Sequence, residues 1–208
     1  MTFDPNDQPR GSGIGAIGDG TASVLLADQL HDVSELFDPS HRGRVFSIFR
    51  HPFARELAKY KYLVSTQTIP ENMTFLDWIN SGEGQTAYER HTNLVRILTN
   101  EPMKDLTPDH IDAAKEVIRR KLIIGFADNL DESFQRFAQY FGWPVGTRLD
   151  CVQHFRRFAE YAVPNDVEAA ALAHTQWADL ELYEYALSIF EEQSVLIEDA
   201  QSLRTKTA

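Results

Sequence analysis

Arg50 is the residue of this sequence that is best placed to bind an anion. It follows the apolar run Val45–Phe49 and directly precedes His51 and Pro52. A guanidinium presents a planar fork of N–H donors that matches the oxygens of a phosphate. A strand that leads into a helix also brings backbone N–H groups and the positive end of the helix dipole to one point. The pattern predicts a phosphate site at residues 49–53, with an internal salt bridge of Arg50 as the alternative.

The residues on either side of Arg50 predict the strand and the helix that would hold it. Val45–Phe49 is rich in β-branched and aromatic residues, which is typical of a buried strand. Pro52 suits the first position of a helix, and apolar residues follow it at helical spacing. His51 is not a favoured N-cap residue, so we expect the first N–H groups of this helix to stay available to an anion. Arg55 and Lys59 lie on the same helix.

The distribution of charge favours a small anionic ligand over nucleic acid. The chain carries a net charge of -11, whereas binding to a polyanion depends on Lys and Arg. Residues 41–63 nevertheless contain six Lys or Arg and one acidic residue, and residues 164–200 contain nine acidic residues and no Lys or Arg. A basic patch in an acidic protein indicates a small anion. A solvated helix face is the alternative explanation of the patch.

Other motifs in the sequence predict no catalytic or metal site. Gly13, Gly15 and Gly18 form G-x-G-x-x-G, but polar residues and prolines precede them where a dinucleotide fold needs a strand. The seven histidines show no metalloprotease spacing, and Cys151 with His154 gives only an isolated C-x-x-H. We therefore expect no metal. No run of about 18 apolar residues occurs, so we expect no membrane span in this chain.

The rest of the chain predicts a mostly helical α/β protein with two strands. Leu122–Phe126 is the second candidate for a buried strand. Apolar spacing and capping residues predict helices at 22–37, 75–79, 86–98, 108–121, 131–141, 150–162 and 178–200. The glycine-rich residues 1–20 read as a disordered arm, residues 21–200 as one domain and residues 201–208 as a frayed tail.

Residues 45–60 resemble the 3′-phosphate-binding segment of sulfotransferases, particularly the Golgi carbohydrate type. That segment is an apolar strand followed by Arg-x-Pro-x-x-Arg-x-x-Ser-x-Tyr, and this chain reads VFSIFRHPFARELAKY. Residues 38–44, DPSHRGR, resemble diatom-type algal members of the same family. Three more blocks resemble the family in the same order, so the resemblance covers about residues 40–193: Asn93–Leu98, Ala113–Trp143 and Asp179–Ala186. It implies a P-loop-NTPase-like sulfotransferase fold and transfer of a sulfuryl group from 3′-phosphoadenosine 5′-phosphosulfate to a hydroxyl or amine, with a carbohydrate as the expected acceptor.

The resemblance also implies roles for individual residues. Arg50 would bind the 3′-phosphate of the donor, and His51, Arg55 and Lys59 belong to the same cofactor-binding segment. Arg55 also matches a position of the pattern at which a structural role is expected. His31, nineteen residues before Arg50, is the candidate for the general base that accepts the proton of the acceptor hydroxyl. A partly exposed helical histidine is the alternative for His31.

Two departures from the family pattern qualify these roles. Ala58 stands where the family has a serine, and its lost hydroxyl is expected to weaken phosphate binding. The family also has an upstream strand and a Pro-Lys-x-Gly-[ST]-[ST]-like loop that binds the 5′-phosphosulfate, and no segment here matches it. We therefore expect either a truncated gene product or a catalytically inactive relative that serves as a binding or interaction protein.

The resemblance further suggests how such a chain behaves and where it acts. Without the upstream strand, the parallel sheet would be incomplete and would expose an edge, so we expect marginal stability or self-association. Family members of this type usually act in the Golgi lumen, which gives the expected compartment, and a glycan is the expected partner.

Overall fold

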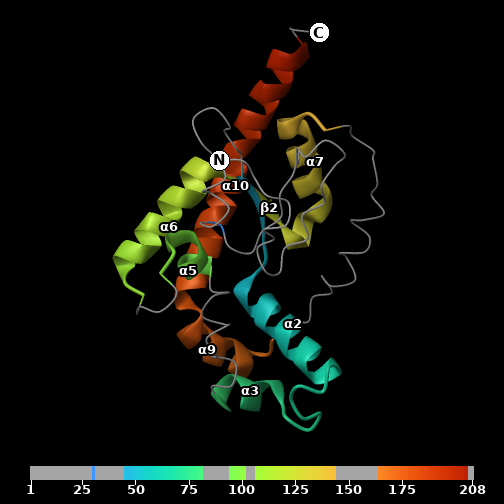
Figure 1. Cartoon of the computed structure of the whole chain (residues 1–208), viewed down its shortest axis with the longest axis vertical. Helices are drawn as coiled ribbons and strands as arrows, with labels where there is room; N and C mark the ends of the chain where they lie inside the picture. Colours follow the sequence, from blue (N-terminus) through green and yellow to red (C-terminus); the bar gives the residue numbers. More distant parts are fainter. Residues whose placement is uncertain (1–29, 31–44, 82–93, 102–105, 144–163, 206–208) are drawn as a thin grey trace, which may run out of the picture. The chain divides into compact units, whose positions relative to one another are not determined.

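A computed structural model of the chain describes Leu30 and residues 45–81, 94–101, 106–143 and 164–205. The chain divides into two compact units, Met1–Gly43 and Arg44–Ala208. The described part of the second unit contains the following elements, most of which are labelled in Figure 1: β1 (Val45–Phe49), α2 (Pro52–Ser65), α3 (Phe75–Ser81), α5 (Leu94–Thr99), α6 (Pro108–Lys121), β2 (Leu122–Phe126), a short 3-10 turn η2 (Ala127–Asn129), α7 (Leu130–Phe141), α9 (Asp166–Thr175) and α10 (Trp177–Thr205).

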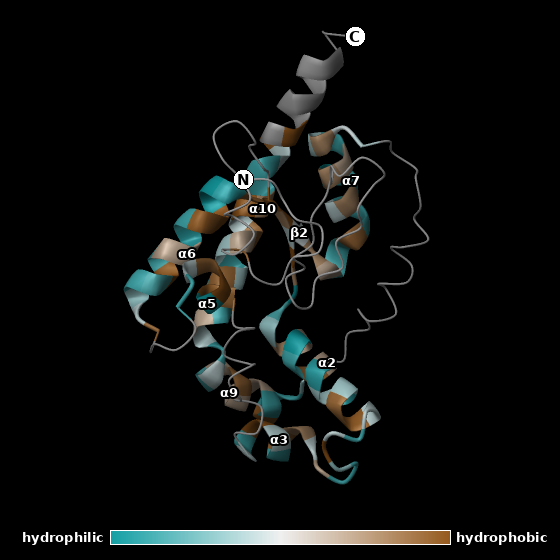
Figure 2. Ribbon diagram, viewed as in Figure 1, coloured by the Kyte–Doolittle hydropathy of each residue, from teal (hydrophilic) through white to brown (hydrophobic). Residues whose placement is uncertain are grey.

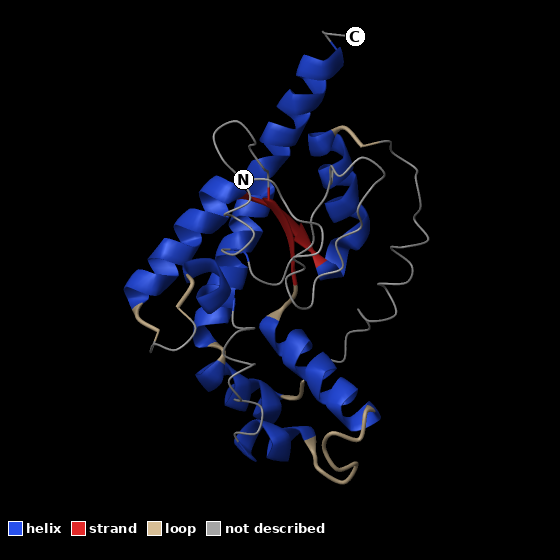
Figure 3. Ribbon diagram, in the orientation of Figure 1, coloured by secondary structure: helices blue, strands red, loops and turns tan. Residues whose placement is uncertain are grey.

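The two strands pair in parallel, and both have the bounds that the sequence predicts. Val45 lies opposite Leu122 and Phe49 lies opposite Phe126. Every residue of β2 is buried, whereas β1 is partly exposed. Helices make up most of the remaining described chain (Figure 3). The prediction of a predominantly helical α/β protein with a small parallel sheet is therefore confirmed.

Side chains close the edge of β2 that faces away from β1. The Gln193 side-chain amide of α10 donates to the carbonyl oxygen of Leu122 at 2.7 Å and accepts from the N–H of Ile124 at 2.9 Å. The N–H of Phe126 donates to Oγ of Ser133 at 2.7 Å. Buried backbone groups need such partners, and these two side chains supply them. Self-association through an exposed strand edge stays a prediction, and it concerns β1 rather than β2.

Local capping chemistry explains where several helices begin and end. Thr74 and Asp77 exchange hydrogen bonds at the start of α3, as the sequence predicts. Thr107 precedes α6, and Pro108 occupies its first position. Helix α7 stops at Gly142, which adopts the left-handed conformation (φ 72°) that glycine accepts without steric cost.

Helix α9 is the element that the sequence analysis missed. Its residues show no apolar stripe of helical period, so periodicity gives no signal there. The signal lies in the cap instead. Oδ1 of Asn165 accepts from the N–H groups of Val167 and Glu168, and the Glu168 carboxylate accepts from the N–H of Asn165. This reciprocal pair is a capping box with asparagine in the first position.

Two apolar regions hold the described elements together. Helix α10 packs against α6, α7 and β2, and α7 packs against β2. Helices α2 and α3 pack together, α3 packs on α9, and a separate cluster of buried side chains lies among these elements: Leu57, Ile69, Phe75, Trp78 and Leu172. In Figure 2, hydrophilic residues nevertheless make up much of α2. Helix α2 therefore begins next to the sheet, and its apolar side chains pack into the cluster formed with α3 and α9.

Replacing Gly125 with alanine is expected to destabilise the protein by about 1–3 kcal/mol, because a methyl group there has no room. A Cβ at this position would lie 2.7 Å from Cζ of Phe137 and 2.8 Å from Cβ of Ser133. The free energy of unfolding, measured by urea titration, checks this. Ala113→Gly on the exposed side of α6 is a control whose smaller loss reflects helix propensity alone. A Gly125→Ala variant with the same free energy of unfolding as the wild type would contradict the described packing of α7 on β2.

Candidate functional site

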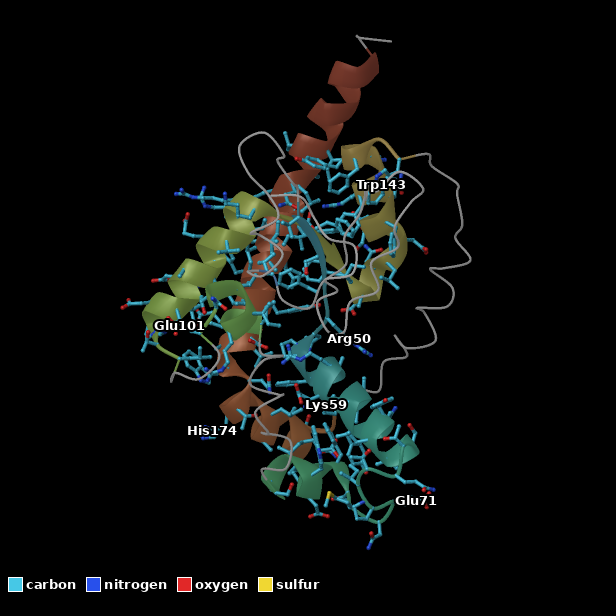
Figure 4. The ribbon with its side chains drawn as sticks, viewed as in Figure 1. Arg50, Lys59, Glu71, Glu101, Trp143 and His174 are labelled. Atoms are coloured by element: carbon cyan, nitrogen blue, oxygen red, sulfur yellow. The ribbon has the colours of Figure 1, made fainter. Side chains whose placement is uncertain are left out.

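The carboxyl ends of the two parallel strands bring together residues that are far apart in the sequence. Phe49 pairs with Phe126, so Arg50 and His51 leave β1 at the same edge where Ala127 and Asp128 leave β2. Figure 4 labels Arg50 at the junction of β1 and α2. Ligands of open α/β sheets bind outside the carboxyl ends of the strands. This edge is the candidate functional site.

Arg50 is partly buried at this edge and keeps its positive charge. Burial lowers the pKa of its guanidinium from the ordinary value, and the nearby Asp128 carboxylate opposes that shift. Arginine remains protonated in proteins even so. The structure thus places a cation at the strand end that the sequence analysis singled out, next to a carboxylate that it did not anticipate.

His51 caps helix α2, and the expectation that it would not do so is wrong. Nδ1 of His51 accepts from the N–H of Phe53 at 3.2 Å, and the carbonyl oxygen of His51 accepts from the N–H of Arg55 at 3.0 Å. An unprotonated ring nitrogen has a lone pair that does the work of a cap oxygen. The imidazole packs edge-on against the rings of Phe53 and Tyr183, with centroids 5.1 Å away in each case.

Asp128 and Tyr183 are members of the site that the sequence analysis did not identify. The Tyr183 hydroxyl donates to Oδ2 of Asp128 at 3.0 Å. Asp128 is exposed as a whole residue, but its carboxyl lies against Tyr183, and this local desolvation raises its pKa, while the hydrogen bond and the charges of His51 and Arg50 act in the opposite direction. Burial also raises the pKa of Tyr183. The position of Asp128 two residues after a predicted strand was the available sequence signal.

Arg55 belongs to an internal ion network beside the site. Nη1 of Arg55 lies 2.8 Å from the carboxylate of Asp179, and Nη2 donates to Oε1 of Gln176 at 2.8 Å. Nε of Arg55 lies 3.3 Å from Glu56. Asp179 is fully buried, and its two carboxylate oxygens accept from the first N–H groups of α5. The Arg55 guanidinium is thus engaged by polar groups of the protein itself.

Lys59 lies along α2 rather than at the sheet edge. It is seven residues beyond Pro52, which corresponds to about 10 Å of helix. Figure 4 labels it on α2, apart from Arg50. Its Nζ lies 5.8 Å from the centroid of the Trp78 ring, and burial lowers its pKa. The structure therefore brings Arg50 and His51 together, with Arg55 one turn further on, and separates Lys59 from them.

Two further predictions concern groups outside this edge. His31, the candidate general base, lies outside the described residues. Within the described ranges, no group of three or more His, Cys, Asp or Glu side chains is arranged to hold a metal ion. None of the described helices combines the length and the apolar content that crossing a membrane requires.

Comparison with known proteins assigns the chain to no family. No protein-family model matches the chain, and neither does any curated protein or solved structure.

Proposed function

We propose that this chain is a sulfotransferase that uses 3′-phosphoadenosine 5′-phosphosulfate as its co-substrate. One observation carries the proposal. Arg50 stands at the carboxyl end of a parallel strand and immediately before a helix, within the segment that resembles the family's 3′-phosphate site. An arginine fork is chemically suited to a phosphate. Arg50 and His51 bind the nucleotide, whereas Arg55 holds α2 in place.

The proposal includes the P-loop-NTPase-like sulfotransferase fold. Two parallel strands in register, each followed by a turn into a helix at the same edge, support it. In this fold a further parallel strand would pair with β1, whose residue Ile48 is 39% exposed. The side chains of Gln193 and Ser133 leave no such room at β2.

The proposed reaction is an in-line transfer between two oxygens. The acceptor hydroxyl oxygen forms a bond to sulfur as the bond between sulfur and the 5′-phosphate oxygen breaks. The hydroxyl proton passes to a general base, for which His31 is the candidate, and 3′-phosphoadenosine 5′-phosphate leaves. Positioning and charge stabilisation supply the rate enhancement. A glycan is the proposed acceptor, and the Golgi lumen is the compartment that such an acceptor implies.

A second function, binding without catalysis, is favoured by Ala58. The family pattern has serine at this position, and Ala58 lies on α2 one turn after Ala54. Residue 58 lies about 9 Å along α2 from Pro52. Side chains of a helix tilt toward its N-terminus, so a hydroxyl at residue 58 would meet a phosphate that extends from Arg50 along the first two turns of α2. A chain that lacks this donor would bind the nucleotide more weakly, which suits an inactive relative that serves as a binding or interaction protein.

Replacing Ala58 with serine is expected to strengthen binding of 3′-phosphoadenosine 5′-phosphate by about 10-fold, because a hydrogen bond to a charged group contributes about 1.5–3 kcal/mol. Calorimetric titration at constant salt measures the change. Ala170→Ser, on the exposed side of α9, adds the same hydroxyl away from the site and should leave the affinity unchanged. Equal affinities of the two variants would show that residue 58 does not face the phosphate.

The proposed function is tested by comparing nucleotides and then measuring transfer. The full chain should bind 3′-phosphoadenosine 5′-phosphate at least 10-fold more tightly than adenosine 5′-monophosphate, since only the former carries a 3′-phosphate. Equal binding, or none by folded protein, would overturn the proposal. Incubation with ³⁵S-labelled donor and a panel of glycans then separates the two functions. Labelled glycan indicates the enzyme, whereas tight binding without transfer indicates the inactive relative.

A further inference from the structure

We propose that His51 is a neutral hydrogen-bond donor of the site, whose Nδ1 is occupied by the cap of α2 and whose Nε2–H binds an oxygen of the anion held by Arg50. That this anion is a nucleotide phosphate rests on the proposed function, whereas the assignment of the proton within the ring does not. His51 is thus a ligand-binding residue, and it is not available as the general base.

The hydrogen bond to Phe53 decides which ring nitrogen carries the proton. A backbone N–H only donates, so Nδ1 of His51, 3.2 Å from the Phe53 nitrogen, must be unprotonated and must accept. The single proton of a neutral imidazole then resides on Nε2. A base would need a lone pair on the ring nitrogen that does not serve the cap, and this tautomer has an N–H there instead.

The surroundings of the ring keep it uncharged at neutral pH. Burial lowers the pKa of His51 from its ordinary value of 6.5, and Asp128 of the turn after β2 acts in the opposite direction without reversing the shift. Tyr183 of α10 and Phe53 of α2 contribute aromatic rings, and Arg50, like His51, acts on the charge of Asp128. Protonation of Nδ1 would also replace the accepted hydrogen bond with two opposed N–H groups.

A neutral hydrogen-bond donor at His51 complements the positive charge of Arg50 in binding an anion. Arg50 supplies the charge for the anion, and a second cation next to it would repel the first in the empty site. A neutral N–H adds a directional hydrogen bond to the anion and does not repel the Arg50 guanidinium. Asp128, oriented by the Tyr183 hydroxyl, lies on the opposite strand end and is an acceptor rather than a donor. Among the described side chains of this edge, Arg50 and His51 are therefore the proposed donors to the anion.

Long-range ¹H–¹⁵N NMR of the imidazole tests the assignment of the proton without any ligand. At pH 7 we expect the Nε2–H pattern for His51, with a titration midpoint below 6.5. The Nδ1–H pattern, or a midpoint above 6.5, would overturn the inference. Spectra of the His51→Gln variant identify the resonance.

Two substitutions separate the cap from the donor. His51→Asn places an amide oxygen where Nδ1 accepts from Phe53 but does not reach the Nε2 position. His51→Gln reaches the Nε2 position with an N–H and gives up the cap. We expect His51→Asn to keep the melting temperature and to lose at least 10-fold in affinity for 3′-phosphoadenosine 5′-phosphate. We expect His51→Gln to melt lower but to bind within about 3-fold of the wild type.

The pattern of outcomes distinguishes this inference from the proposed function. If His51→Asn bound 3′-phosphoadenosine 5′-phosphate as tightly as the wild type, His51 would serve only as a helix cap, and the inference would be overturned. The same titrations are repeated with inorganic phosphate as a second probe. Suppose that the wild type binds inorganic phosphate but not the nucleotide, and that His51→Asn binds phosphate more weakly. This result would support the role of His51 and overturn the sulfotransferase proposal. Binding of neither probe by folded wild-type protein would overturn both.

Discussion

Replacing Arg50 with alanine is expected to reduce the affinity for 3′-phosphoadenosine 5′-phosphate by about 100-fold or more. A bidentate guanidinium makes two charge-assisted hydrogen bonds to a phosphate, and each contributes about 1.5–3 kcal/mol. Arg50→Lys keeps the charge but loses the fork, so its affinity should fall between those of the wild type and the alanine variant. Calorimetric titration at low salt measures all three affinities.

The control for Arg50 removes an equal charge from elsewhere on the protein. Arg120 lies on α6, and its side chain is 65% exposed and paired with Glu116 of the same helix. Arg120→Ala should therefore bind the nucleotide like the wild type, apart from a small change from the altered net charge. If the two alanine variants lost affinity equally, the binding would reflect diffuse attraction to the protein and not a site at the end of β1.

Replacing Asp179 with alanine is expected to cost about 3–5 kcal/mol of the free energy of unfolding, the largest stability effect anticipated for this chain. The substitution leaves the Arg55 guanidinium without its buried partner and removes the acceptor of two N–H groups at the start of α5. Loss of one partner of a buried ion pair costs about this much. Among the described residues, Arg55 would keep only Glu56, whose carboxylate lies 3.3 Å from its Nε, as a charged partner. A domain of this size should melt about 10 °C lower.

A salt bridge at the surface provides the matched comparison for Asp179. Glu181 lies two residues further along α10, pairs with Lys115 at 2.5 Å, and has a side chain that is 46% exposed. Glu181→Ala should change the free energy of unfolding by less than about 1 kcal/mol. Urea titrations of both variants, together with Arg55→Ala and the double variant, measure the coupling. Additive effects of Asp179→Ala and Arg55→Ala would contradict the described network.

Local patterns in the sequence were sufficient to predict most of the described elements. Both strands have their predicted bounds, and α6 and α7 begin within one residue of the predicted position. Apolar spacing, a first-position proline and a stop glycine act within one or two turns of chain, so a short window contains the information. Helix α9 was not predicted because a capping box marks its start and no apolar stripe runs along it.

The junction of β1 and α2, and the position of Arg50 at that junction, follow from local sequence patterns alone. Long-range packing sets which residues lie near Arg50 there. Asp128 reaches the site because β2 pairs in register with β1, and Tyr183 reaches it because α10 packs against β2. Arg55 has a partner 121 residues away in Gln176. Helix and strand signals depend on neighbours in the chain, whereas these contacts depend on long-range packing that no local pattern encodes.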